Sequence, residues 1–155
     1  MKKLEHLISR FLKYGTLVST LALILSVVVQ IYARFFMESA PSWTEEASRV
    51  FFIYAISFAA GLAYKQHYYV FLDLISSHLN AKGNWMLDLT VNLLVLLLFL
   101  VLAIFSIPYI NMGLDERSPS LGFNMAISFT SMLLLGTSLC FYSFQKIIKL
   151  IQKKV

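Results

Sequence analysis

The residues best suited to chemistry gather in a short polar segment, where a large aromatic side chain stands beside two acids and a base. This outer cluster consists of Trp43, Glu45, Glu46 and Arg49, and Arg34 precedes it at the end of an apolar run. Charged groups in such a cluster either bind a ligand or hold segments together through ion pairs. We favour the second use and predict that the cluster ties the first two helices to each other or to a partner subunit.

The same segment has the pattern of a helix start. Ser42 and Glu45 have the spacing of a capping box, in which each side chain bonds a backbone N–H of the first turn. Acids in the first turn are favoured by the positive end of the helix dipole. Glu45 and Arg49 form an i, i+4 pair with the acid first, which is the better orientation. We therefore predict a helix start here and expect Arg49 to belong to a partly buried ion pair.

The sequence contains no other catalytic or metal-binding pattern. His6, His67 and His78 do not have the spacing of a zinc motif. The single cysteine, Cys140, excludes an intrachain disulfide and a cysteine-cluster metal site. No P-loop, glycine-rich phosphate motif or Ser-His-Asp order is present. We expect a protein that is not an enzyme and that holds no cofactor or metal in this chain.

Composition defines the class of protein that must position these residues. Apolar types make up 59% of the 155 residues and charged types only 14%, whereas soluble domains are about 45–50% apolar and about 25% charged. Too few polar groups remain to cover a water-exposed surface. The net charge of +5 does not indicate nucleic-acid binding, because the basic residues lie at the ends and between apolar runs, as in membrane proteins. We predict one integral membrane domain over residues 1–155, in contact with lipid.

Four apolar segments are long enough to cross a bilayer, which takes about 20 helical residues. They cover residues 14–36, 43–64, 87–112 and 121–148. Four segments cannot close a β-barrel, so we predict an all-α protein with four transmembrane helices. Ten Lys and Arg residues fall in the two termini and the middle connection, against three in the other two connections. This distribution predicts cytoplasmic N- and C-termini.

Two further segments are amphipathic. In residues 2–13 the apolar side chains recur at helical spacing opposite a basic face, and residues 68–80 show a similar division. We predict short interfacial helices over both. For residues 2–13, an extension of the first transmembrane helix is an equally good interpretation of the pattern.

The predicted membrane centre holds no ionisable residue, although carriers usually keep one there for an ion or proton. Gln30, Asp88 and Asn92 are the polar residues nearest to it. Small residues recur along the second span at Ala55, Ala59 and Ala63, with Gly61 on a neighbouring line. Small residues in register let helix backbones approach closely. The pattern favours a chain that packs against helices and does not carry a substrate by itself.

The run from Gln30 to Asp73 resembles the small membrane subunit of the tripartite ATP-independent periplasmic (TRAP) transporters, the DctQ type. The first helix ends in an aromatic and Arg34 segment, and Trp43, Glu45, Glu46 and Arg49 form a Trp-x-Glu-Glu-x-x-Arg core. An aromatic, small-residue helix follows. The length, the four spans and the inside termini fit across the whole chain.

The resemblance implies a bacterial inner-membrane protein with two partners. A large DctM-type membrane subunit would hold the substrate and sodium sites, and a DctP-type periplasmic protein would deliver an organic acid, such as a C4-dicarboxylate or sialic acid. The small subunit would act as a scaffold. Two alternatives remain open from the residues: a self-sufficient, homo-oligomeric small carrier using Gln30, Asp88 or Asn92, and a membrane assembly protein without a transport role.

Overall fold

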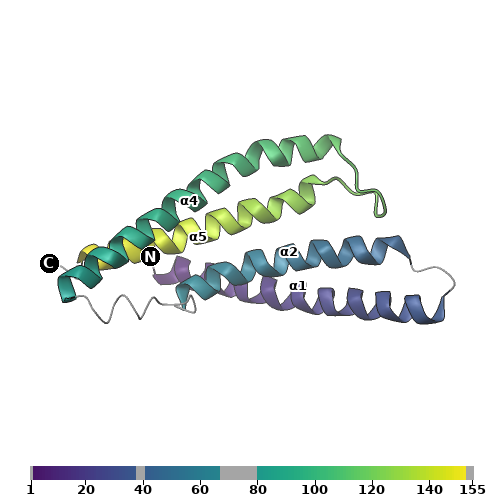
Figure 1. The fold of residues 1–155 in the computed structure, drawn as a ribbon, viewed down its shortest axis with the longest axis horizontal. Helices are drawn as coiled ribbons and strands as arrows, with labels where there is room; N and C mark the ends of the chain where they lie inside the picture. Colours follow the sequence, from purple (N-terminus) through teal and green to yellow (C-terminus); the bar gives the residue numbers. More distant parts are fainter. Residues whose placement is uncertain (1, 38–40, 67–79, 153–155) are drawn as a thin grey trace.

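A computed structural model describes residues 2–37, 41–66 and 80–152 of the chain (Figure 1). Its helices are α1 (Lys2–Phe36), α2 (Ser42–Lys65), α4 (Ala81–Asp115) and α5 (Ala126–Gln152). All four are long and apolar enough to cross a membrane. At about 1.5 Å per residue, the 35-residue helices α1 and α4 exceed the ~30 Å of bilayer hydrocarbon. The prediction of an all-α protein with four membrane-spanning helices is confirmed.

The helix boundaries differ from the predicted ones in three places, and the first is α4, which begins at Ala81, before the predicted start at residue 87. Residues 2–13 do not form a separate helix, because α1 runs without interruption from Lys2 to Phe36; no proline occurs in this stretch to break it. The extension is thus the correct interpretation. The last helix begins at Ala126 and not near residue 121, because a tight turn precedes it in which Gly122 has φ of 71°, a value that glycine adopts readily. The predicted helix over 68–80 lies almost wholly outside the described residues.

The helices lie in a row, with α1 beside α2, α2 beside α5, and α5 beside α4 (Figure 1). The pairs α1–α2 and α4–α5 are antiparallel, whereas α2 and α5 run in the same direction (Figure 1). The start of α1 and the end of α5 therefore share one end of the molecule, called here the termini end. The opposite end, called the loop end, holds the α1–α2 and α4–α5 connections. Two helical hairpins are therefore joined mainly along a seam between α2 and α5.

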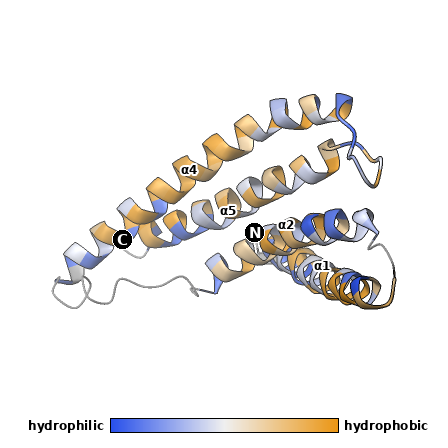
Figure 2. Cartoon of the chain, turned by 45° about the vertical axis from the view of Figure 1, so that its right-hand side comes forward, coloured by the Kyte–Doolittle hydropathy of each residue, from blue (hydrophilic) through white to orange (hydrophobic). Residues whose placement is uncertain are grey.

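The buried interior is small and sits near the termini end. Leu12, Tyr64, Leu139 and Tyr142 form its centre, and each is at most 9% exposed. Long apolar side chains are instead exposed, on α1 and α4 above all, and most of the α4 ribbon has the hydrophobic colour (Figure 2). Exposed apolar side chains on long helices are stable only against lipid or another protein. The row thus presents two wide apolar faces.

Candidate helix-anchoring sites and partner surface

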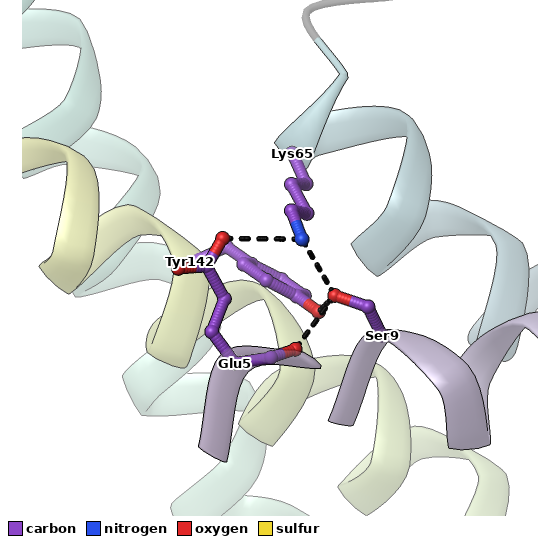
Figure 3. A network of polar contacts seen from close by, with 4 residues as sticks. All are labelled: Glu5, Ser9, Lys65 and Tyr142. Atoms are coloured by element: carbon purple, nitrogen blue, oxygen red, sulfur yellow. Dashed lines mark hydrogen bonds and ion pairs between the residues drawn. The ribbon is translucent and has the colours of Figure 1, made fainter. Parts of the chain in front are cut away.

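A polar network joins three helices at the termini end (Figure 3). The Nζ atom of Lys65, the last residue of α2, lies 3.1 Å from Oε1 of Glu5 on α1. It also donates a hydrogen bond of 2.7 Å to Oγ of Ser9. The Ser9 hydroxyl lies 2.9 Å from the hydroxyl of Tyr142 on α5, and the ammonium stands 5.9 Å from the centre of the Tyr142 ring. One lysine thereby connects α1, α2 and α5.

A second polar network is fully buried between α2, α4 and α5. The hydroxyl of Tyr64 donates to Oδ1 of Asn92 and lies 3.2 Å from Oγ of Ser143. The Ser143 hydroxyl in turn donates to the backbone oxygen of Asn92 over 2.7 Å. Asn92 is 2% exposed and Ser143 is 0% exposed. Buried polar groups need such partners, and here they link three helices, so Asn92 has a structural role.

The same end of the molecule contains a cavity of about 70 Å³. Its walls come from α1, α2 and α5. The lining residues are Glu5, Tyr64, Lys65, Tyr142, Gln145, Lys146 and Lys149. Lys146 is half-buried, with its Nζ atom 5.6 Å from the centre of the Tyr64 ring. The cavity is therefore bounded by both polar networks and carries more positive than negative charge.

At the loop end, Glu46 connects α2 to the α4–α5 connection. Its Oε2 atom accepts backbone hydrogen bonds from Ser120 at 3.0 Å and from Leu121 at 3.2 Å. Within the connection, the backbones of Arg117 and Asn124 pair in an isolated antiparallel β-bridge. The outer cluster was predicted to tie the first two helices together, whereas Glu46 ties α2 to the turn that precedes α5.

The other members of the outer cluster point toward the surroundings. Arg49 lies 3.4 Å from Glu45, as the i, i+4 spacing predicts, but the two side chains are 74% and 68% exposed. The pair is thus not partly buried within this chain, and that expectation is wrong. Arg34 and Trp43 are also exposed. Their predicted contact with a partner subunit remains a prediction.

The predicted capping box at the start of α2 does not form. Pro41 occupies the N-cap, with φ of −62°, and no side chain makes a cap hydrogen bond there. Ser42 is consequently the first helical residue, one position too late for its hydroxyl to cap the first turn. Thr44, which is 1% exposed, donates instead to the backbone oxygen of Pro41 over 2.8 Å.

The small residues of α2 divide between two environments. Gly61 and Ala55 are buried, whereas Ala59 and Ala63 are half-buried. A Cβ atom at Gly61 would lie 3.0 Å from Cβ of Ser138 on α5 and 3.1 Å from Cδ1 of Leu12 on α1. Gly61 therefore lies where α2 packs closely against both of its neighbours. Near the loop end the same seam is closed by the Tyr54 hydroxyl, which donates to the backbone oxygen of Ile127 over 2.6 Å.

Sequence reasoning missed the network of Glu5, Ser9, Lys65 and Tyr142, because each of these residues is ordinary at a helix end. Ser9 and Tyr142 are separated by 133 positions, so no local spacing relates them. One indication was available: Glu5 and Lys65 are opposite charges on segments predicted to share the same side of the membrane. Within the described ranges, no group of three or more His, Cys, Asp or Glu residues could hold a metal ion.

The row of long apolar helices, fastened to one another by polar contacts at both ends, defines a multi-pass membrane protein. Comparison with known families places it more closely. A model of the DctQ component of the tripartite ATP-independent periplasmic transporters matches residues 23–153. The chain belongs to this family, the small permease subunits of TRAP transporters.

A curated relative agrees with the family match. Over 147 residues the chain is 22% identical to a protein of Haemophilus influenzae assigned as a TRAP transporter small permease protein. The matched region covers 95% of this chain and 89% of the relative. The likeness therefore extends over nearly the full length of both proteins.

Proposed function

We propose that this chain is the scaffold subunit of a sodium-coupled TRAP transporter that imports an organic acid, such as a C4-dicarboxylate or sialic acid. In this proposal the chain lies in the bacterial inner membrane with both termini in the cytoplasm. The described part of the chain has its termini at one end, which fits that orientation. The excess of Lys and Arg at the same end supports it.

The observation that best supports the scaffold role is that Asn92 is buried and hydrogen-bonded to neighbouring helices. A self-sufficient carrier would need polar side chains of this kind to line a path for its substrate. Asn92 is instead buried, and its side chain accepts a hydrogen bond from Tyr64 while its backbone accepts one from Ser143. Its polar groups hold helices together, and this use supports a scaffold role over a carrier role.

The partners follow from the family. A large DctM-type membrane subunit would hold the substrate and the sodium ions, and a DctP-type periplasmic protein would deliver the substrate. The apolar faces of α1 and α4 offer this chain two wide surfaces for a membrane partner. At the loop end, that subunit or the periplasmic protein that delivers the substrate would contact the exposed residues Arg34, Trp43, Glu45 and Arg49.

Reconstitution tests the scaffold role directly. The tagged chain is isolated in mild detergent, its bound proteins are identified, and the chain alone and the isolated complex are placed in proteoliposomes. We expect a large membrane protein to be recovered with the chain, and sodium-driven organic-acid uptake by the complex but not by the chain alone. Uptake by the chain alone would overturn the scaffold role, and Asp88→Asn would then show whether Asp88 lines the path.

A further inference from the structure

The cavity at the termini end has the charge of an anion site. Three lysines and one glutamate line it, which gives the lining a formal charge of +2. Glu5 is already engaged with Lys65 at 3.1 Å, so its charge is largely compensated. The remaining lysines, Lys146 and Lys149, both lie on α5 and are separated by one helical turn. This spacing places them on the same face of the helix.

Neither lysine forms a close ion pair in the part of the chain that the structure describes, although Asp88 acts on Lys146 and Glu5 acts on Lys149 at longer range. The ion pairs found in residues 2–37, 41–66 and 80–152 are Glu5–Lys65 and Glu45–Arg49. Lys146 is nevertheless half-buried, and partial burial of an ammonium group costs free energy unless an opposite charge compensates it. An anion in the cavity would supply that charge.

The cavity has the size and the donors for a phosphate group. Its volume of about 70 Å³ exceeds the ~30 Å³ share of one water molecule, so there is room for a group of several heavy atoms. Lys146, Lys149 and the amide of Gln145 supply charged and neutral hydrogen-bond donors around it. Phosphate oxygens accept such charge-assisted bonds.

The surroundings of the cavity are those of a lipid headgroup. Apolar side chains that are more than half exposed stand within two positions of the lining residues; they are Leu4, Phe144 and Ile151. Such side chains offer a surface for acyl chains where the helices leave the hydrocarbon. Basic pockets between transmembrane helices are a known form of anionic-lipid recognition.

We propose that this cavity binds the phosphate of an anionic phospholipid headgroup, in the leaflet at the termini end. Lys146 and Lys149 contact the phosphate, and the Glu5–Lys65 pair forms the wall opposite them. The same phosphate chemistry is present in free inorganic phosphate, and the exposed apolar side chains that neighbour the lining residues along the chain favour the lipid. This site concerns lipid binding by the chain itself and does not depend on its role in transport.

Native mass spectrometry of the delipidated full-length chain tests the proposal. The chain is titrated with phosphatidylglycerol, with phosphatidylethanolamine, and with inorganic phosphate at constant ionic strength. We expect one tightly held phosphatidylglycerol, weaker binding of phosphatidylethanolamine, and no displacement of the lipid by phosphate. Equal binding of the two lipids, or displacement by millimolar phosphate, would overturn the assignment to an anionic lipid.

Matched double variants separate the site from general electrostatic attraction. K146Q/K149Q removes the two cavity lysines, and K3Q/K13Q removes two exposed lysines near the same end of the molecule, with the same change in net charge. We expect phosphatidylglycerol binding to fall about fivefold for each cavity lysine removed, and to stay within twofold (roughly) in K3Q/K13Q. An equal loss in both variants would refute the site.

The single variant K149Q tests the site even if the double variant K146Q/K149Q misfolds. Lys149 is exposed, so its substitution leaves the packing of α5 unchanged. The expected loss of lipid affinity is about fivefold, in a protein whose melting temperature without lipid equals that of the unaltered chain. Unchanged lipid affinity in K149Q would contradict the proposal even if the double variant does not fold.

Discussion

Lys65 Nζ lies 3.1 Å from Glu5 Oε1, so the last residue of α2 is fastened to the first turns of α1. Their side chains are only 33% and 21% exposed, and Ser9 provides a second partner for the ammonium. The α1–α2 hairpin is therefore closed at the end away from its connection. Because Ser9 also meets Tyr142, the same contact holds the hairpin against α5.

Removing this pair should weaken the packing of α1 against its neighbours. Lys65→Met is expected to lower the free energy of unfolding in detergent by about 1 kcal/mol, since partial exposure limits the strength of an ion pair. Glu5→Gln should cost a similar amount. In the double variant the two losses should be less than additive, because both remove one interaction. Lys13→Met, at an exposed position of α1, is the control, and strict additivity would contradict the direct coupling of the pair.

Glu46 and Glu45 are adjacent acids with different contacts, so a substitution of Glu45 is a matched control for the same substitution of Glu46. Glu46→Gln weakens the acceptor for the backbone N–H groups of Ser120 and Leu121, so these two amides should exchange their hydrogens faster. Hydrogen exchange measured by mass spectrometry on peptides covering residues 116–125 follows this change. Glu45→Gln removes only an exposed partner of Arg49 and should leave the exchange unaltered. Equal effects of both substitutions would refute the anchoring role of Glu46.

A substitution at Arg49 should affect assembly with a partner subunit but not the stability of the isolated chain. Its pair with Glu45 is exposed, and exposed pairs contribute about 0–1 kcal/mol. Arg49→Glu should therefore change the melting temperature of the isolated chain very little. We expect the same substitution to reduce recovery of the large membrane subunit in a pull-down. Undiminished recovery would place Arg49 outside the interface, and a large loss of stability in the isolated chain would contradict the exposed geometry.

Gly61 allows a graded test of the α2–α5 seam. A methyl group at this position gains about 1 kcal/mol of intrinsic helix propensity but lies 3.0 Å from Ser138 Cβ, so Gly61→Ala should be close to neutral. Gly61→Leu has no space and should cost about 1–3 kcal/mol through overpacking. Thermal unfolding in detergent measures both. A leucine variant as stable as the alanine variant would show that the helices do not approach as closely as the structure has them.

The spans were predictable because the hydrophobic runs are long and the backbone in lipid has few alternatives to a helix. Boundaries depended on local chemistry that hydropathy does not record. Pro41 at the N-cap shifted the role of Ser42, and the turn at Gly122 delayed the start of α5 to Ala126. Continuity of α1 through residues 2–13 was one of two interpretations that the amphipathic pattern left open.

The anchoring contacts were harder to predict than the helices. Gly61 was identified from the small-residue pattern of α2, and the structure shows which helices it approaches. Glu46 was identified as part of a cluster, but its backbone partners at Ser120 and Leu121 depend on the turn conformation. The Ser9–Tyr142 contact joins residues 133 positions apart, and such a contact follows only from the order of the helices in space.

The order of the helices in the row has a consequence for how the protein is made. Neighbours in the row are α1, α2, α5 and α4, whereas the ribosome delivers α4 before α5. During translation, α4 therefore reaches the membrane before the helix that is its main neighbour exists. The α1–α2 hairpin likewise lacks its contact with α5 until α5 has been synthesised. Both contacts are supplied by α5, so a ribosome that stalls before Ala126 leaves the α1–α2 hairpin and α4 without the packing of α5 against either of them.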